Sequence, residues 1–489
     1  MEFLIRVTIA VSILILPVAC SLQDTNVNPN ASTETSVSAV LTGAEVALGF
    51  NLGVNGGLIA NIYIQQASGA NGDAASFDNY TSSPHYFNST WRGFYVDVLD
   101  ELQIVRRTAA AQKLPYYSGI ARILSTYTFG TLTDLFGDIP YKDALSGNQV
   151  TNPAFDKQED IYADLQLQLD SAIRELSVPA TENFGALPAT DDVIYGGNVE
   201  RWKSLAYTLK ARYAIHLSKL GSTAAAQQVL NALYDGSRFR AIAENLADAQ
   251  VVFGSSTTNS NPFYQQNTNR PGWIGLGASF VNLLNGNAVT DAATKPEGLL
   301  VDPRRAYFAT PYPTGSSTYR GSAPGVSGAF SVIGSYYGTA TSPVIISSYS
   351  EAKFLEAEAR YRINPQDPLV KTALEAAIRA SFVRVINNAS DPYATVEKQQ
   401  AYIAANVANP DLKTIITQKY IALFLQPEAW TDYRRTGYPA IPLAQNATSA
   451  ANPEGKIPRR IPYPQNEVSL NRNTPEGSGY QTPALWWDK

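Results

Sequence analysis

The sequence has 489 residues, enough for one large helical domain or for two to three ordinary domains. Its formal net charge is -5 and it has no run of lysine and arginine, which argues against nucleic acid as a partner. One cysteine and two histidines exclude an internal disulfide bond and argue against a His/Cys metal site.

The N-terminus is predicted to be a signal peptide, residues 1–19. An apolar run, Val7–Val18, follows Arg6 and is too short to cross a bilayer. After Cys20 we find no further apolar run that is long enough to cross a membrane. Residues 20–35 are polar and without periodicity, so they are predicted to be a flexible tether.

Cys20 is the predicted site of lipidation. Leu16 to Cys20 resembles a bacterial lipobox, in which the cysteine becomes the acylated first residue of the mature protein. Pro17 stands where the usual lipobox has leucine, so a signal peptide without lipid remains the alternative. Lipid chains would hold the protein at a membrane without a transmembrane helix.

Apolar residues at spacings of three and four predict a succession of helices. Glycines between Gly49 and Gly57 weaken the first of them or allow it to pack closely against a neighbour. The predicted helical segments are 36–66, 91–102, 120–127, 161–176, 202–213, 349–362, 369–387, 396–408 and 412–426.

Two long segments lack this periodicity. Residues 248–347 are rich in Gly, Ser, Thr, Asn, Pro and Tyr, with strand-like pieces such as Val344–Ile346. So long an irregular stretch inside a compact protein is usually functional. The tail from Gly437 to Lys489 is rich in proline and is predicted to run extended over the surface.

A charged, aromatic corner is predicted where the last helix ends. Pro427 limits the helix, and Glu428, Asp432, Arg434 and Arg435 follow it closely. Arginines beside carboxylates form fork-like ion pairs that can lock a corner. We favour that structural role; the alternative is that one of the arginines holds an acidic ligand.

The same corner resembles the C-terminal signature of the SusD/RagB family, in its SusD-like lipoprotein branch: QK-x-IALF followed by EAW-x-DYRRTG-x-P. Four further blocks occur in the order of that family and extend the resemblance over most of the mature chain. They are TLTDLFGDIPYKDAL (131–145), RWKSLAYTLKARYAIHLSK (201–219), SEAKFLEAEARYR (350–362) and RRIPYPQNEVSLN (459–471).

The resemblance implies a mostly α-helical single domain over residues 36–489, built on tetratricopeptide-like helix pairs, with a long irregular loop region and few short strands. It also implies an outer-membrane lipoprotein, exposed at the cell surface, that binds glycan nutrients and delivers them to a SusC-like TonB-dependent transporter. A peptide-binding lid of the same kind of transporter is one alternative. A secreted helical glycoside hydrolase is the other.

Catalytic residues and cofactors are not expected. The sequence contains no phosphate-binding loop, no Gly-x-Ser-x-Gly elbow and no His-Glu-x-x-His motif. His216 lies within an apolar helical stripe and is predicted to be packed in the core. Carboxylate pairs could serve a glycosidase, yet each has a structural interpretation as well. These pairs are Glu351 with Glu358, Asp191 with Asp192, and Asp134 with Asp138.

Two loops combine aromatic rings with amides and charges, as a sugar site requires. Without periodicity, their aromatic side chains are predicted to be exposed platforms; local packing onto the helices is the alternative. Tyr336-Tyr337 is a third, weaker candidate. The predicted ligand contacts are Phe77, Tyr80 and His85 in the first loop, and Tyr264, Asn267, Arg270 and Trp273 in the second.

Overall fold

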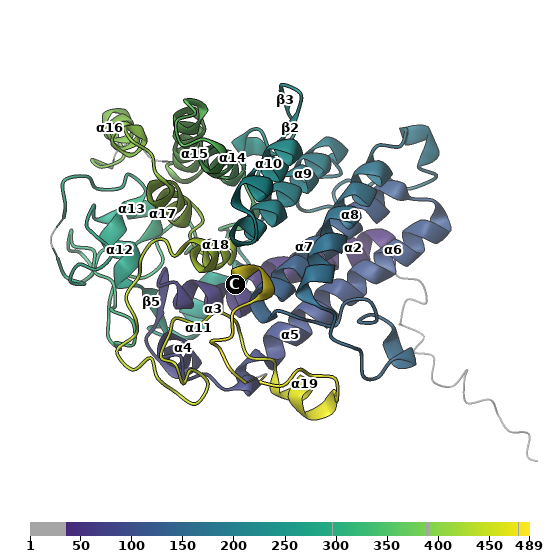
Figure 1. Cartoon of the computed structure of the whole chain (residues 1–489), viewed down its shortest axis with the longest axis horizontal. Coiled ribbons are helices and arrows are strands. Elements are labelled where there is room, and N and C mark those ends of the chain that lie inside the picture. The colour runs from purple at the N-terminus through teal and green to yellow at the C-terminus, as the bar shows by residue number, and fades with distance from the viewer. Residues whose placement is uncertain (1–35, 296, 388–390, 478) are drawn as a thin grey trace, which may run out of the picture. The chain divides into compact units, whose positions relative to one another are not determined.

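The computed structural model describes residues 36–295, 297–387, 391–477 and 479–489 (Figure 1). The predicted signal peptide, Cys20 and the tether lie outside these residues. In the described part, residues 37–489 form one compact unit made mostly of helices, with short two-stranded sheets. The predicted fold class, a mostly helical single domain with few short strands, is confirmed.

The first helical segment runs from Val37 to Tyr63 without a break. It consists of α2 (Val37–Phe50), a π-helical turn η1 (Asn51–Asn55) and α3 (Gly56–Tyr63). Three of its glycines, Gly49, Gly53 and Gly56, lie where other elements approach closely. A Cβ at Gly53 would lie 2.3 Å from Pro262, and one at Gly56 would lie 2.7 Å from Leu135. Close packing therefore explains glycines that would otherwise only weaken a helix.

This segment corrects one expectation from the sequence. Val37–Tyr63 is long and apolar enough, by length and composition, to cross a membrane, although no such run was expected after Cys20. Within its most apolar window, 56% is buried inside the protein. Its apolar side chains, such as Leu41 and Leu48, belong to the main hydrophobic cluster, so here it serves as a core helix.

The next helices pack side by side in chain order, α6 on α7, α7 on α8, α8 on α9 and α9 on α10. The predicted stripe of α8 is the reason it packs this way, because Ile161, Leu165 and Leu169 are all buried. The bounds of these elements are α5 (Asn88–Phe94), η3 (Tyr95–Asp100), α6 (Glu101–Gln112), α7 (Pro115–Phe136), α8 (Gln158–Leu176), α9 (Val199–His216) and α10 (Ser222–Leu233).

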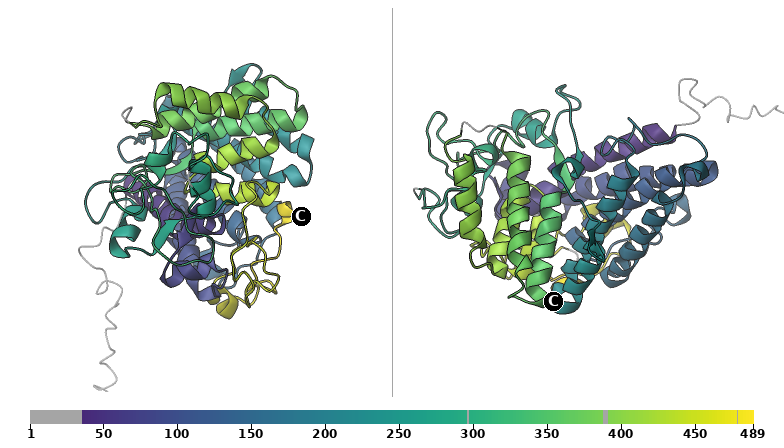
Figure 2. Two further views of the ribbon diagram at one scale, coloured as in Figure 1. Left: turned by 90° about the vertical axis from the view of Figure 1, so that its left-hand side faces the viewer. Right: turned by 90° about the horizontal axis from the view of Figure 1, so that it is seen from above.

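The stack continues into the C-terminal half, since α10 packs against α14, and α14 against α15 and α17. Figure 2 shows these helices beside the pairs of the N-terminal half. The predicted last helix ends earlier than expected, at Ala422, and a separate helix follows Pro427. The bounds are α14 (Tyr349–Ile363), α15 (Leu369–Val385), α16 (Val396–Val407), α17 (Leu412–Ala422) and α18 (Glu428–Thr436).

Short elements interrupt the irregular region 248–347. In the described residues, β5 of this region pairs with β1 from an earlier part of the chain, and β4 pairs with β6 within the region. The strands β2 and β3 precede the region and pair with each other. All three pairs are antiparallel. The strand-like piece expected at Val344–Ile346 is part of β6. The bounds are β1 (Ala67–Gly69), β2 (Tyr234–Asp235), β3 (Arg238–Phe239), β4 (Ala249–Val251), α11 (Pro262–Asn269), β5 (Ile274–Leu276), α12 (Ala278–Leu284), α13 (Arg305–Phe308) and β6 (Val344–Ser347).

The tail is extended apart from α19 (Gln465–Leu470) and a final turn η8 (Trp486–Asp488). Its end enters the core instead of staying on the surface as predicted. Trp487 is fully buried, and its indole nitrogen donates to Asp134 at 3.1 Å. Asp488 forms ion pairs with Lys219 and Arg459. These contacts anchor the C-terminus to α7 and to the turn that follows α9.

Candidate ligand-binding site

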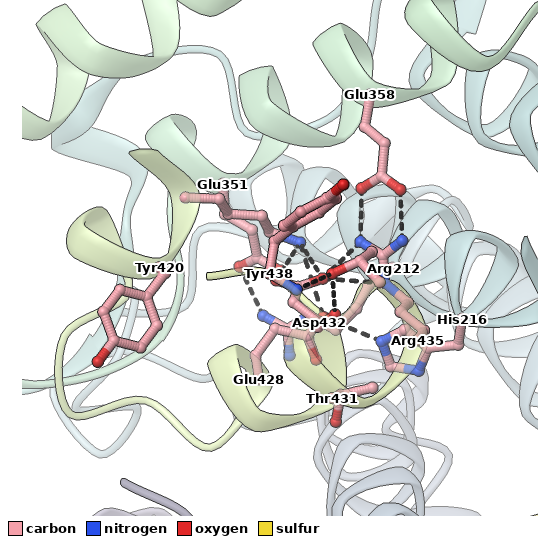
Figure 3. Close-up of polar contacts among 12 residues, drawn as sticks. Arg212, His216, Glu351, Glu358, Tyr420, Glu428, Thr431, Asp432, Arg435 and Tyr438 are labelled. Carbon is pink, nitrogen blue, oxygen red and sulfur yellow. Dashed lines mark hydrogen bonds and ion pairs between the residues drawn. The ribbon is translucent and has the colours of Figure 1, made fainter. Parts of the chain in front are cut away.

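Around α18 the structure assembles a buried network of charges that holds three helices together (Figure 3). Arg212 of α9 forms a fork-like pair with Glu351 of α14, with both N–O distances 2.6 Å. Arg435 of α18 forms a second fork with Glu358 of α14. All four side chains are buried, so solvent is excluded from both pairs.

Arg434 is also buried, and its guanidinium lies 3.8 Å from the ring centre of Trp430. It donates to the backbone oxygens of Asp134 and Arg459, at 2.5 and 3.0 Å. Both arginines of this corner are therefore occupied inside the protein. The structural role favoured for Arg434 and Arg435 is confirmed, and their alternative role as ligand contacts is not.

Two carboxylates of this network, those of Glu358 and Glu428, are unsuited to acid catalysis. A general acid in a glycosidase needs a raised pKa. Burial alone raises the pKa of Glu358, but the nearby Arg435 and Arg362 outweigh burial and lower it to about 2. For Glu428, His216 and Arg212 likewise outweigh burial and lower the pKa. Both groups therefore remain ionised and serve as counter-charges.

His216 and the remaining acid pairs also have structural roles. His216 is fully buried, as predicted, and its ring contacts Glu428 at 2.9 Å. Asp192 accepts hydrogen bonds from three backbone amides of the turn that follows it and from the indole of Trp202. Asp138 accepts from the backbone amide of Gln158 at 2.8 Å. Among the described residues, no group of three or more His, Cys, Asp or Glu side chains is placed to hold a metal ion.

The first predicted binding loop is partly helical, with α4 (Gly72–Asp78) and η2 (Pro84–Phe87). Phe77 and Tyr80 are only 9% and 1% exposed, so the prediction that they form an exposed platform is wrong. Phe77 packs on Tyr86, and Tyr80 packs edge-on against Tyr63 of α3. The physical reason is that α4 turns these rings inward onto the core.

His85 behaves differently from its neighbours. It is exposed, and its ring centre lies 4.1 Å from that of Tyr86, which is half-buried. Its Nδ1 contacts the hydroxyl of Ser83. Of the three contacts predicted in the first loop, His85 is the one whose side chain reaches solvent.

The second predicted loop folds as α11. Asn261 caps this helix by accepting from the amides of Phe263 and Tyr264. Tyr264 and Asn267 are half-buried, whereas Arg270 is exposed. The Arg270 guanidinium lies 4.7 Å from the ring centre of Trp273, which is half-buried. This loop thus presents the mixture of aromatic and polar groups that was predicted for it.

The structure brings the two loops together through the β1–β5 pair. Ser68 lies opposite Gly275, and the amide of Ala70 donates to the carbonyl of Trp273 at 2.8 Å. The Trp273 ring covers Gly72, where a Cβ would come within 2.3 Å of it. Figure 1 shows β5, α4 and α11 on the same side of the stack. Segments slightly more than 200 residues apart in the sequence therefore share one surface.

A cleft that was not predicted from the sequence lies beside α13. It has a volume of about 500 Å³ and is lined by tyrosines, serines and an asparagine, with Arg305 at its wall. The guanidinium of Arg305 lies between two rings, 4.4 Å from the centre of Tyr319 and 4.5 Å from that of Tyr393. Glu297 pairs with Arg305 at 2.6 Å and accepts from the Tyr393 hydroxyl at 2.8 Å.

This cleft has the composition of a sugar site, with half-exposed aromatic faces among hydroxyl and amide groups. Its residues come from segments far apart in the sequence, so no local motif marks them. The features of the sequence that could have indicated this cleft are the Asp391-Pro392-Tyr393 turn and the tyrosines of the irregular region. Tyr337, by contrast, is buried and stacked on Phe308, so the third candidate pair supplies core packing.

Comparison with known proteins gives consistent results. A SusD-like family described as "Starch-binding associating with outer membrane" matches residues 29–464. No curated protein matches the sequence with significance. Among solved structures, a SusD/RagB family protein from Bacteroides thetaiotaomicron superposes with a TM-score of 0.76 at 22% identity, over 93% of this chain and 99% of that one.

A chitin-binding SusD homologue from Flavobacterium johnsoniae superposes with a TM-score of 0.72 at 22% identity, over 92% of this chain and 98% of that one. A SusD homologue from Parabacteroides distasonis gives 0.74 at 22% identity, over 93% and 97%. At such identities the structural matches establish the fold alone.

Proposed function

Since the chain belongs to the SusD-like family, we propose that it is a cell-surface protein that binds a glycan nutrient and delivers it to a SusC-like TonB-dependent transporter. Proteins of this family are non-catalytic binding proteins associated with the outer membrane. The secreted glycosidase considered from the sequence is therefore not retained. The observation that carries the proposal is the tyrosine-lined cleft beside α13; the Arg270–Trp273 pair belongs to the same irregular region of the chain.

The chemistry of that surface favours a sugar. Hexose rings have apolar faces that pack on aromatic rings, and hydroxyl rims that hydrogen-bond to amides, hydroxyls and guanidinium groups. Tyr319, Tyr393 and Trp273 supply half-exposed rings, and Arg270 and Asn267 supply polar groups. The family description names starch, and one structural relative is named for chitin. A peptide remains the alternative ligand.

The predicted contacts take different parts in this proposal. His85, Tyr264, Asn267, Arg270 and Trp273 have exposed or half-exposed side chains and would touch the ligand. Phe77 and Tyr80 lie beneath the surface, where they would support it. The lipid on Cys20 would hold the protein at the outer membrane, and the protein would there pass the ligand to the transporter.

The proposal is tested by isothermal titration calorimetry on the chain from Ser21 onward, which contains the whole compact unit. Soluble starch, chitin oligosaccharides and other neutral glycans are titrated, with peptides as a separate panel. Trp273→Ala and Tyr393→Ala should each weaken glycan binding about 2- to 13-fold, because an aromatic stacking contact is worth roughly 0.5–1.5 kcal/mol.

Phe184→Ala is the matched control, since Phe184 is a 63% exposed aromatic residue outside this surface. It should bind as the unchanged protein does. Glycan binding that is insensitive to both Trp273→Ala and Tyr393→Ala would reject the proposed site. Binding of peptides and of no glycan would replace the sugar by the alternative ligand.

A further inference from the structure

A second cleft lies in the helix stack. Its lining shares no element with the cleft beside α13, which is the proposed glycan cleft. The second cleft is formed by α6, α7, α8 and the loop 141–149, and its volume is about 750 Å³. This size lies within the roughly 300–1,000 Å³ typical of small-molecule sites. Figure 1 shows α6, α7 and α8 on the opposite side of the stack from α12 and α13.

The charges that line this cleft are unbalanced. Four cationic side chains, those of Arg106, Arg107, Arg122 and Lys142, line it together with the carboxylates of Asp164 and Glu175. Lys142 pairs with Asp156 at 3.6 Å. Both lining carboxylates are already occupied. Glu175 accepts from Arg122 at 2.6 and 3.2 Å, and Asp164 accepts from the hydroxyl of Tyr141 at 2.5 Å and from the amide of Gln168 at 3.1 Å.

Arg106 and Arg107 lack a paired carboxylate in the described part of the chain. Neither forms a hydrogen bond or an ion pair with another residue in the described part of the chain, and Nε of Arg106 is buried without a partner. Burial, and then the nearby Arg122, lower the pKa of Arg106. A partly buried guanidinium such as that of Arg106, with a donor that has no partner, is unfavourable unless an anion compensates its charge. The planar fork of an arginine matches the geometry of a carboxylate, as it does that of a phosphate.

The rest of the lining is that of a sugar site. Phe129 and Tyr141 form an aromatic edge, with ring centres 4.7 Å apart. Gln103 and Gln149 add amides, and Oε1 of Gln103 is buried without a donor. We infer that this cleft is a separate binding site for a sugar that bears a carboxylate, a uronic acid, with Arg106 and Arg107 holding the carboxylate.

The test is calorimetry on the chain from Ser21 onward with trigalacturonate and with its fully methyl-esterified form. The ester replaces each carboxylate by a neutral methyl ester and leaves the rest of the sugar unchanged. Trigalacturonate should bind, and both the ester and the Arg106→Gln variant should weaken binding about tenfold or more, as loss of a charge-assisted hydrogen bond does. Arg107→Gln, at an exposed position, should give a similar loss without any effect on the core.

Arg379→Gln is the matched control, because Arg379 is an exposed arginine of α15 paired with Glu375. It should leave trigalacturonate binding unchanged. Absence of trigalacturonate binding, equal binding of the ester, or an equal loss in Arg379→Gln would overturn the inference. Tighter binding of triglutamate with the same dependence on Arg106 would overturn the sugar assignment and favour an acidic peptide.

This test is independent of the proposed glycan cleft. Arg106→Gln should leave the binding of neutral glycans unchanged, and Trp273→Ala should leave the binding of trigalacturonate unchanged. If neutral glycans fail to bind while trigalacturonate binds through Arg106, the proposed function fails and the inference stands. If Trp273→Ala abolishes trigalacturonate binding, the carboxylate site lies elsewhere and the inference fails.

Discussion

Single charged residues in the core of this protein act as connectors between helices. Glu358 of α14 meets Arg435 of α18, and Glu351 of α14 meets Arg212 of α9, each through two hydrogen bonds. Lys419 of α17 adds a pair with Asp432 at 2.8 Å. A buried charge that keeps its partner is tolerated, whereas one that loses it is strongly destabilising. The network therefore fixes which helix surfaces can meet.

Glu358→Gln should destabilise the protein by about 3–5 kcal/mol, because Arg435 would lose its forked partner while remaining buried. Urea unfolding at pH 7 measures this change in free energy. Glu375→Gln removes a carboxylate from an exposed pair with Arg379 and should change stability by less than about 1 kcal/mol. Equal effects of the two substitutions would contradict the connector role.

The same pair makes a pH-dependent contribution. The pKa of Glu358 is lowered to about 2 in the folded protein, against an ordinary value of 4.5 for a free glutamate. A lowered pKa means that the stabilisation is complete above the unfolded value and is lost as the pH falls through the folded value. The stability difference between the unchanged protein and Glu358→Gln should therefore shrink between about pH 4.5 and pH 2.

At the scale of secondary-structure elements, short pieces decide the shape of the proposed binding surface. The three-residue strands β1 and β5 align α4 with the Trp273 loop, and α4 and α11 are only seven and eight residues long. Elements this short leave little periodicity in a sequence, which is why both were interpreted as loops. For the same reason, the inward orientation of Phe77 and Tyr80 could not be predicted.

Gly72→Ala tests this alignment. Gly72 has a φ of +56°, and a Cβ there would lie 2.3 Å from the Trp273 ring. The variant should lose about 1–3 kcal/mol of stability from strain and displaced packing, measured by urea unfolding, and should bind glycan more weakly. Gly43→Ala is the control, since a Cβ at Gly43 of α2 meets no atom within 4 Å. That control should be unchanged or up to about 1 kcal/mol more stable. Unchanged stability of Gly72→Ala would contradict the close contact.

Over the whole molecule, residues far apart in the chain meet in the core. Arg434 donates to the backbone of Asp134, Trp487 donates to the side chain of Asp134, and Gln66 donates to the carbonyl of Tyr420 at 2.6 Å. The C-terminal tail therefore helps to join the first helices to the last. Both proposed clefts lie on this common framework, one in the irregular region and one in the helix stack.

The proposed attachment of the whole protein to the outer membrane depends on Cys20. In a bacterial host with an outer membrane, the unchanged protein should fractionate with that membrane, and Cys20→Ser should appear in soluble fractions because it lacks an acyl anchor. Fractionation with immunodetection measures the distribution. Ser21→Ala is the control for the neighbouring position. Retention of Cys20→Ser in the outer membrane would reject lipidation at this residue.

The sequence by itself determined the class of the fold and the positions of most long helices, because their apolar stripes recur over three or more turns. It also determined the family, through motifs such as the corner at 417–439, and the structural role of Arg434 and Arg435, through the matching carboxylates beside them. The Tyr319–Arg305–Tyr393 cleft and the Arg106 cleft were decided by tertiary structure alone. The physical reason is that exposure and unpaired charge depend on neighbours from distant segments, and no local pattern records which segments those are.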